Sequence, residues 1–397
     1  MQKAGGHLTR RGERRPSRAV QSAAVSRSLN SLQPYVHNPL PVKPSPDAWV
    51  CGLIGDHPST YSRSPRIWNA AFRELNLDAV YAPFDVDLME LPALVEALRR
   101  EPRFLGTNVT VPYKQAIIPL LDAVDDRAAR LEAVNTVFRT PDGALHGSNT
   151  DGEGAIGSLT RGWPGQPGPF LPSLDRRNVL LIGAGGAGSA VAFALAEAIG
   201  PSGRLFIANR TPETAFLLGE RVSEAFGNTQ GLDEADADVL VPAIDLIVNA
   251  STRGQAGARA VRNGKLAYLE PYSALAPANP PSIDEQPDEP EPDRQQRWLS
   301  TAADSILENH ALSMRLVTRV AKHTAFFDLV YAPSETTMLR HARWAGRPGL
   351  NGQGMIVFQA AAAFMDYIAR PLLASPMLDE AAVRERVVET MALNWGT

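Results

Sequence analysis

Hydrophobic and polar positions alternate along the chain in blocks that predict strands followed by helices. From Trp49 onward, short apolar segments are each followed by a stretch in which apolar residues recur at helical spacing. The predicted strands of the first half are 49–55, 79–86 and 104–112, and the predicted helices are 65–77, 88–100 and 114–122. Strands that alternate with helices predict an α/β fold with a parallel sheet.

The third predicted strand ends in an unusual way. In the segment GTNVTVPYK, Asn108 and Thr110 alternate with Val109 and Val111, so both valines are expected to face the core. The segment ends in Lys114, just after a proline. A lysine at the start of a helix is usually solvated, so this segment alone does not decide whether Lys114 has a function.

A second unit begins after the Pro- and Gly-rich stretch RGWPGQPGPFLPS, which we interpret as a linker. An apolar strand runs directly into GAGGAG and an Ala-rich helix, and another strand follows about 20 residues later, as in dinucleotide-binding folds. Glycines at these positions let the backbone approach a pyrophosphate, which the helix N-terminus attracts. The candidate residues are Gly183, Gly185, Gly186 and Gly188. The alternative is that they only form a tight turn.

The strand ends of this unit carry the next candidates. Asn209, Arg210 and Thr211 stand where an NAD-specific site has an acidic residue, and a guanidinium suits a ribose 2′-phosphate. The pattern therefore favours NADP over NAD as cofactor, unless Arg210 is only a solvated side chain. Asn249 and Ser251 end a further strand, on the ligand side of a doubly wound sheet.

The last part of the chain is less regular. Prolines and acidic residues dominate 271–298, so we expect a disordered or loosely packed insertion at about 256–300. A helix over 300–323 and a strand over 325–333 follow, and the segment 349–368 is predicted to be a Gly-rich turn that leads into a helix. Gln359 lies among the apolar residues of that last helix, either as a buried hydrogen-bonding group or as a ligand contact. Gly352, in the turn before it, is a further cofactor candidate.

Composition narrows the function classes. The chain has 397 residues, 44% hydrophobic and 21% charged, with a net charge of −4, which gives no reason to expect nucleic acid as a partner. The single cysteine, Cys51, excludes an intramolecular disulfide and a Cys-based zinc site, and we expect no metal. No apolar run approaches the ~20 residues of a membrane span. Neither a nucleic acid nor a membrane partner is therefore expected.

The N-terminal segment, 1–47, is basic and is expected to be a disordered leader. Its first 40 residues hold seven Lys and Arg residues against a single acid, Glu13, together with several serines. This composition also resembles that of a mitochondrial transit peptide, so the expected location is cytoplasmic with a mitochondrial alternative.

Nine short strings, in this order, resemble the shikimate dehydrogenase family, including its quinate-oxidising members: SRSP, NVTVPYK, AVNT, NTDG, GAGGAG, NRT, NAS, DLVYAP and GQGMIVFQA. They run from about Gly52 to about Tyr367. The resemblance implies two domains: a parallel-sheet substrate domain over 48–160, completed by 340–397, and a Rossmann-like NAD(P)-binding domain over 175–339.

The resemblance also implies a reaction. It is the interconversion of 3-dehydroshikimate and shikimate, or of 3-dehydroquinate and quinate, in the shikimate pathway of aromatic amino acid biosynthesis. The family's catalytic pair corresponds to Lys114 and Asp151. The matched substrate-binding residues are Ser62 and Ser64 for the carboxylate, Thr110 and Asn135 for ring hydroxyls, and Gln359 and Tyr331 for the ring.

The chemistry agrees with these roles, because hydride transfer to a carbonyl also requires a proton that a positioned lysine can donate. The alternatives are a dehydrogenase of quinate or of a specialised cyclic hydroxy acid, and a non-catalytic metabolite sensor. The presence of both Lys114 and Asp151 favours an enzyme, which we expect to be a monomer or homodimer.

Three positions depart from the family pattern. Glu132 replaces a glycine before AVNT and places a new charge near the substrate strand. Tyr61 stands where many relatives have histidine. Thr214 stands where many NADP-preferring members have a second arginine, which weakens the expected grip on a phosphate.

Overall fold

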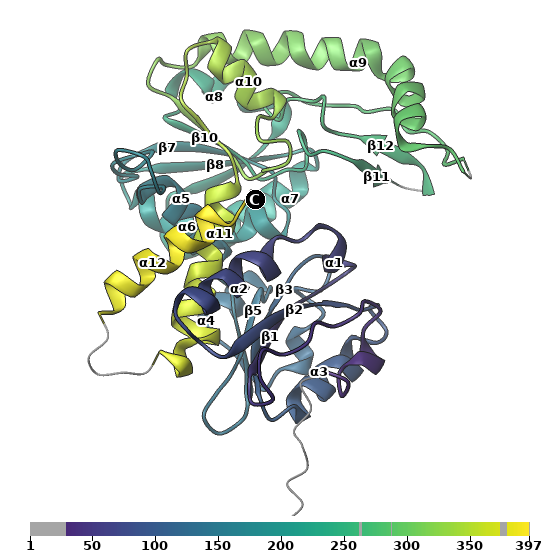
Figure 1. Cartoon of the computed structure of the whole chain (residues 1–397). Helices are drawn as coiled ribbons and strands as arrows, with labels where there is room; N and C mark the ends of the chain where they lie inside the picture. Colours follow the sequence, from purple (N-terminus) through teal and green to yellow (C-terminus); the bar gives the residue numbers. More distant parts are fainter. Residues whose placement is uncertain (1–28, 262–263, 287, 374–378, 397) are drawn as a thin grey trace, which may run out of the picture.

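The computed structural model describes residues 29–261, 264–286, 288–373 and 379–396, and these form two lobes, each built on a six-stranded sheet (Figure 1). The first 28 residues, and with them most of the predicted leader, lie outside the described residues. Among the described helices, none combines the length and apolar character needed to cross a membrane.

The first sheet has the strand order β2-β1-β3-β5-β6-β4. Strands β1 to β3 are parallel, as predicted, whereas β5 pairs antiparallel with both β3 and β6. Its strands are β1 (Trp49–Gly55), β2 (Ala79–Asp85), β3 (Phe104–Val109), β4 (Ala123–Val124), β5 (Thr136–Arg139) and β6 (Leu145–Ser148). Its N-terminal helices are α1 (Pro58–Tyr61), α2 (Ser64–Glu74), α3 (Leu91–Arg100) and α4 (Asp126–Leu131).

The segment after β3 differs from the prediction. Strand β3 ends at Val109, and Val111, expected in the core, is 69% exposed because the chain has already left the sheet. The predicted helix 114–122 is a series of turns that ends in a short 3₁₀ helix, η2 (Ile118–Leu120). Pro119 has no N–H to donate and its ring crowds the preceding turn, so an α-helix does not continue there.

The C-terminal part of the chain returns to the first lobe. Helix α11 (Gln353–Ala362) continues into the π-helical turn η6 (Ala363–Ile368) and the 3₁₀ turn η7 (Arg370–Leu372), and α12 (Glu380–Leu393) follows. Buried residues of these elements, such as Phe364 and Met391, share a core with Trp68 of α2. The first lobe is therefore assembled from both ends of the described chain.

The second sheet is parallel throughout, in the order β14-β13-β10-β7-β8-β9. Its strands are β7 (Asn178–Ile182), β8 (Arg204–Asn209), β9 (Thr229–Asp233), β10 (Leu246–Asn249), β13 (Ala325–Asp328) and β14 (Gly349–Leu350). Apolar side chains pack α5 (Asp151–Thr160), α6 (Gly186–Ile199) and α7 (Pro212–Phe226) on one face, and α9 (Glu291–Arg319) and α10 (Thr337–Trp344) on the other. Because β14 pairs with β13, this unit extends to Leu350, beyond the predicted boundary at 339.

The segment expected to be a disordered insertion is folded. The hairpin β11 (Ala258–Ala260) and β12 (Leu266–Tyr268) contributes Tyr268 to a buried aromatic cluster with Tyr272 and Trp298. The Trp298 indole N–H donates to the Pro281 carbonyl at 2.7 Å. The expectation was wrong because aromatic residues that lie far apart in the sequence meet here and bury enough apolar surface to order the segment.

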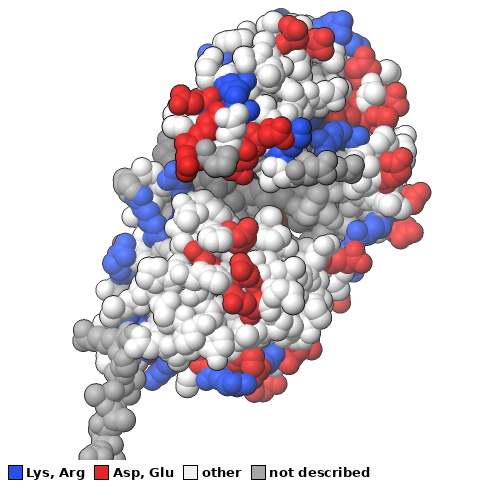
Figure 2. All heavy atoms as spheres, turned by 90° about the vertical axis from the view of Figure 1, so that its right-hand side faces the viewer, with Lys and Arg blue, Asp and Glu red and all other residues white. Residues whose placement is uncertain are grey.

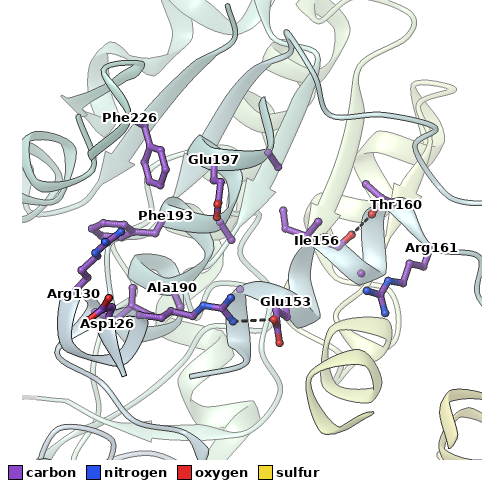
Figure 3. A pocket seen from close by; sticks show the side chains of 16 residues that line it. Asp126, Arg130, Glu153, Ile156, Thr160, Arg161, Ala190, Phe193, Glu197 and Phe226 are labelled. Atoms are coloured by element: carbon purple, nitrogen blue, oxygen red, sulfur yellow. Dashed lines mark hydrogen bonds and ion pairs between the residues drawn. The ribbon is translucent and has the colours of Figure 1, made fainter. Parts of the chain in front are cut away.

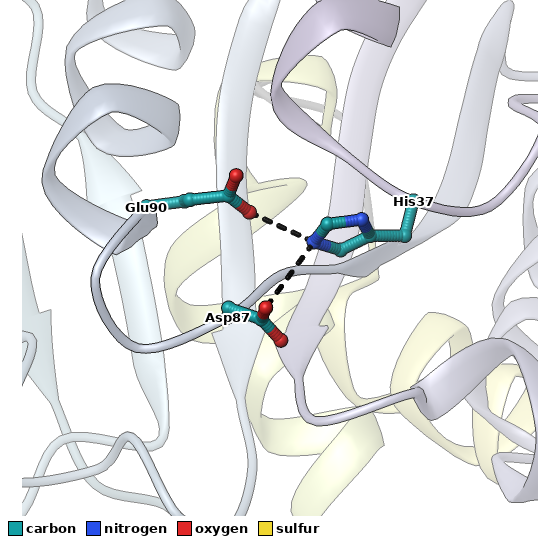
Figure 4. Close-up of side chains that lie close together, drawn as sticks. All are labelled: His37, Asp87 and Glu90. Carbon is teal, nitrogen blue, oxygen red and sulfur yellow. Dashed lines mark hydrogen bonds and ion pairs between the residues drawn. The ribbon is translucent and has the colours of Figure 1, made fainter.

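Part of the predicted leader is also folded. Leu29, Leu32 and Val36 are buried in the core of the first lobe, around the 3₁₀ turn η1 (Gln33–Tyr35). On the surface nearby, His37 Nε2 lies 2.7 Å from Glu90 Oε2 and 3.9 Å from Asp87 Oδ2 (Figure 4). The expected disorder of 1–47 is therefore wrong for residues 29–47, which apolar burial holds against the sheet.

A buried histidine predicts how stability depends on pH. His341 of α10 is 2% exposed, and its Nδ1 lies 2.8 Å from the Ser313 hydroxyl of α9. Burial, together with the nearby charges of His310 and Arg340, lowers the pKa of His341 to about 4. Between pH 6.5 and 4 the unfolded chain thus binds a proton at this residue that the folded chain does not bind.

The free energy of unfolding should therefore fall as the pH drops from 6.5 to 4, by up to ~3 kcal/mol from this residue. A His341→Gln variant should show a shallower fall in urea unfolding between pH 7.5 and 5. The exposed His323, changed to Gln, is the control. Equal pH dependence of wild type and His341→Gln would contradict the assignment.

Candidate active site

A cavity of about 110 Å³ between the lobes is lined by all eight of the predicted catalytic and substrate-binding residues. All but Gln359, which lies within α11, stand at the end of a helix or strand or in the turn next to it. The space-filling view shows a hollow that separates the two lobes (Figure 2). The residues are Ser62, Ser64, Thr110, Lys114, Asn135, Asp151, Tyr331 and Gln359.

An ion pair joins the two predicted catalytic residues in this cavity. Lys114 Nζ lies 2.6 Å from Asp151 Oδ2, and the side chains are 20% and 4% exposed, respectively. Asp151 is the first residue of α5, where the positive end of the helix dipole stabilises a carboxylate. Lys114 comes from the turns after β3, so two distant segments form the pair.

Asn135 holds the second oxygen of that carboxylate. Its Nδ2 donates to Asp151 Oδ1 at 2.8 Å, and its Oδ1 accepts from the Thr150 backbone N–H at 2.9 Å. Gln359 Oε1, on α11, is 3.3 Å from the same Nδ2. The Gln359 Nε2 group has no protein partner among the described residues, so it is available to a ligand in the cavity.

The turn between β7 and α6 has the shape expected of a pyrophosphate site. Gly183 has φ +109°, and a Cβ there would lie 2.7 Å from the Ser251 backbone N. A Cβ on Gly188 would overlap the Gly183 carbonyl, so this glycine lets the helix approach the strand. Around Gly185 and Gly186 the described part of the chain leaves open space, over the N–H groups that begin α6.

Two further cofactor candidates have internal roles. The Asn249 amide is fully buried and donates to Asp328 Oδ1 at 2.8 Å, while its Oδ1 accepts from the Ser251 backbone N–H and hydroxyl. The Asn249 side chain therefore positions Ser251, and the predicted cofactor contact of this segment stays a prediction. A Cβ on Gly352 would overlap the Leu329 carbonyl, so this glycine permits close packing at the start of α11.

The predicted ribose-site residues lie at the end of β8. Asn209 Oδ1 accepts from the Ala184 backbone N–H at 3.2 Å and so links β8 to the glycine turn. Arg210 and Thr211 are exposed. Within the described residues, the Arg210 guanidinium forms no ion pair or hydrogen bond, so it is available to a phosphate.

Glu132 does not place a charge in the cavity. It ends α4 in the left-handed region, with φ +50°, a conformation in which a glycine is unstrained. Its carboxylate points to the second lobe, 3.8 Å from Arg221 of α7. The new charge therefore faces the second lobe rather than the cavity.

Sequence reasoning missed several residues of the cavity wall. Tyr61 and Arg63 are neighbours in sequence of Ser62 and Ser64, so the SRSP motif could have predicted that they line the cavity. No sequence motif pointed to Trp395, because it lies beyond the last of the nine strings that resemble the family. Other missed lining residues are Leu53, Trp68, Val109, Ile356 and Ala360.

A second cavity, of about 600 Å³, lies between α4, α5, α6 and α7 (Figure 3). It contains no predicted site residue, and its Arg127 and Glu153 pair with each other at 2.9 Å. The smaller cavity, with its unsatisfied polar groups around an ion pair, is the better candidate for chemistry.

Comparisons with known proteins agree with this geometry. Residues 53–137 match the family model described as the shikimate dehydrogenase substrate binding domain. A relative from Moorella thermoacetica, named shikimate dehydrogenase (NADP(+)), is 35% identical over 324 residues, covering 81% of this chain and 88% of the relative. The chain belongs to the shikimate dehydrogenase family.

Solved structures of this family share the fold. A Thermus thermophilus shikimate 5-dehydrogenase, in complex with NADP(H) and shikimate, is 27% identical with a TM-score of 0.56 and covers 86% of this chain and 99% of its own. A Corynebacterium glutamicum quinate dehydrogenase in complex with NAD is 28% identical with a TM-score of 0.59, covering 85% and 98%. Membership of the shikimate dehydrogenase family therefore rests on both sequence and fold.

The Asn135 network yields a stability prediction. Asn135→Ala removes the donor to Asp151 Oδ1 and leaves a buried carboxylate oxygen without its partner, so the free energy of unfolding should fall by about 1–3 kcal/mol. Urea unfolding at neutral pH measures this. Gln115→Ala, an exposed amide in the turn after Lys114, is the matched control. An unchanged stability for Asn135→Ala would show that the carboxylate does not depend on this bond.

Proposed function

We propose that the protein is an NADP-dependent shikimate dehydrogenase, which interconverts 3-dehydroshikimate and shikimate. The observation that carries the proposal is the Lys114–Asp151 ion pair within the cavity that also holds the predicted substrate-binding residues. The names of the family members add the substrate and the cofactor. A substrate bound among these side chains would meet a proton donor at its carbonyl oxygen.

The second lobe fits the cofactor. The open space over Gly185 and Gly186 leaves the N–H groups of α6 free for a pyrophosphate, and the exposed Arg210 stands where a 2′-phosphate would be read. When bound, the dinucleotide supplies the hydride to the carbonyl carbon, or accepts it in the reverse direction.

The chain's own residues manage the proton. In reduction, the Lys114 ammonium donates a proton to the substrate oxygen as the carbonyl becomes a hydroxyl, and solvent then reprotonates the amine. Asp151 accepts a hydrogen bond from Lys114 and so fixes the direction in which the ammonium points. Asn135 in turn fixes Asp151, which keeps the donor in place without a further reorganisation step.

Substrate recognition would come from the first lobe. Ser62 and Ser64 flank the start of α2, where hydroxyl groups and the helix dipole both suit a carboxylate. Thr110 and the free amide group of Gln359 face the cavity from other sides and suit ring hydroxyls. The expected cytoplasmic location and the monomeric or homodimeric state stay predictions.

Oxidation of quinate is a second candidate function. The similarity to a structure named quinate dehydrogenase, at 28% identity, favours it. Shikimate and quinate are both cyclic hydroxy acids, and a pocket that hydrogen-bonds one substrate hydroxyl rejects the analogue that lacks it. The two candidate functions therefore share one mechanism. They differ in which substrate hydroxyl groups the cavity binds.

Turnover tests the proposal. Purified protein is assayed with shikimate or quinate and with NADP or NAD, by the absorbance of reduced nicotinamide, and kcat/KM should be highest for shikimate with NADP. Lys114→Ala should lower kcat by about 10²–10⁴-fold while cofactor binding is retained. Lys322→Ala, an exposed lysine outside the cavity, is the control. Absence of turnover, together with a ligand-induced rise in Tm, would instead support a metabolite sensor.

Cofactor preference depends on Arg210. Arg210→Ala should raise the Kd for NADP by about tenfold and leave the Kd for NAD nearly unchanged, because only NADP carries the 2′-phosphate. Fluorescence titration of the reduced cofactors measures both constants. The exposed Arg204, at the other end of β8, serves as the matched arginine control. An equal rise in Kd for NADP and NAD would contradict the role of Arg210 in binding the 2′-phosphate.

A further inference from the structure

One wall of the substrate cavity is built by the end of the chain. Arg63, which stands between the two candidate carboxylate-binding serines, donates from Nη1 to the Trp395 carbonyl at 2.7 Å. Its guanidinium carbon also lies 5.4 Å from the centre of the Trp395 ring, a distance at which a cation is attracted to an aromatic face. Both side chains line the cavity.

Trp395 also contacts the second lobe. It is 8% exposed, and its ring meets Tyr331 edge-on, with centroids 5.2 Å apart and planes at 83°. Tyr331 follows β13, so the tryptophan lies between a loop of each lobe. The C-terminus accordingly lies at the junction of the two lobes (Figure 1).

The packing of α12 keeps this wall in place. Helix α12, which ends just before Trp395, packs against α2, which begins just after Arg63. Arg386 of α12 also donates to Glu74 at the far end of α2 at 2.8 Å. The two helices thus hold the tryptophan over the N-terminus of α2.

Arg63 gives the cavity a net positive charge. Its ionised side chains are two cations, Arg63 and Lys114, and one carboxylate, Asp151, which is already paired with Lys114. Without Arg63 the ion pair would leave the cavity with no net charge to balance an anionic substrate. Among the described residues, the only hydrogen-bond acceptor of the Arg63 guanidinium is the Trp395 carbonyl, so its remaining N–H groups are available.

We propose that Arg63 is a third carboxylate-binding residue beside Ser62 and Ser64, and that Trp395 is the positioning residue that holds its guanidinium there. The inference rests on the proposed function for the identity of the anion, but its geometry is independent of the hydride step. A carboxylate that receives two hydroxyl groups and a guanidinium is bound by charge-assisted hydrogen bonds. The C-terminal segment thereby contributes to the selection of substrates that carry a carboxylate.

Steady-state kinetics with a charged and an uncharged substrate tests this inference. For shikimate, Arg63→Ala and Trp395→Ala should each raise KM by about tenfold and change kcat little, because the lost contact is the same in ground and transition states. For shikimate carboxamide, which has no carboxylate, neither variant should change KM relative to wild type. Trp395→Phe keeps an aromatic face, so its KM for shikimate should be close to that of the wild type.

Matched controls and a binding measurement complete the experiment. Leu393→Ala, at an exposed position at the end of α12, should behave as wild type. Calorimetric titration of shikimate into the wild type and both variants reports the carboxylate contact even without turnover. Urea unfolding confirms that each variant is folded.

The outcomes separate the inference from the proposed function. The carboxylate role of Arg63 and Trp395 would be overturned if KM rose equally for shikimate and its carboxamide. It would also be overturned if neither variant bound shikimate more weakly than the wild type. A wild type that binds shikimate but does not oxidise it would remove the proposed function, while a weaker affinity in Arg63→Ala would still support the inference. A wild type that does not bind shikimate would overturn both.

Discussion

The site depends on keeping one buried ion pair, Lys114 with Asp151, in a fixed geometry. A buried carboxylate is costly unless both oxygens are satisfied, and here one oxygen takes the ammonium and the other takes the Asn135 amide. The N-terminus of α5 adds a favourable dipole. These requirements explain why the turns after β3, the residue before β5 and the start of α5 must all meet at one point.

The helices that carry these groups also join the two lobes. Helix α5 packs closely on α11, and a Cβ on Gly154 would lie 2.5 Å from the Met355 carbonyl. Helix α5 also packs on α6, where a Cβ on Gly152 would come within 2.9 Å of Ala194. The Asp151 carboxylate, the Gln359 amide and the glycine turn therefore belong to α5, α11 and α6, and α5 packs on both of the other helices. Small residues at these two interfaces set the relative positions of the three groups.

Sequence patterns predicted the elements well where local physics decides them. The buried strands of both sheets and the glycine turn before α6 follow from apolar runs and from glycine's conformational freedom. The predictions failed where a distant contact or a proline overrides the local pattern. Pro119 prevents the expected helix, and the aromatic cluster around Trp298 orders a segment whose composition indicates disorder.

The sequence by itself determined the fold class, the family and the eight residues that converge on the cavity, because motifs of a few residues encode strand ends and helix starts. Only the tertiary structure decided that Asn249 is an internal support, that Glu132 points away, and that the chain's end forms a wall of the site. Arg63 and Trp395 are 332 residues apart. No periodicity or motif records such a pairing, because it exists only after the C-terminal helices have packed back onto the first sheet.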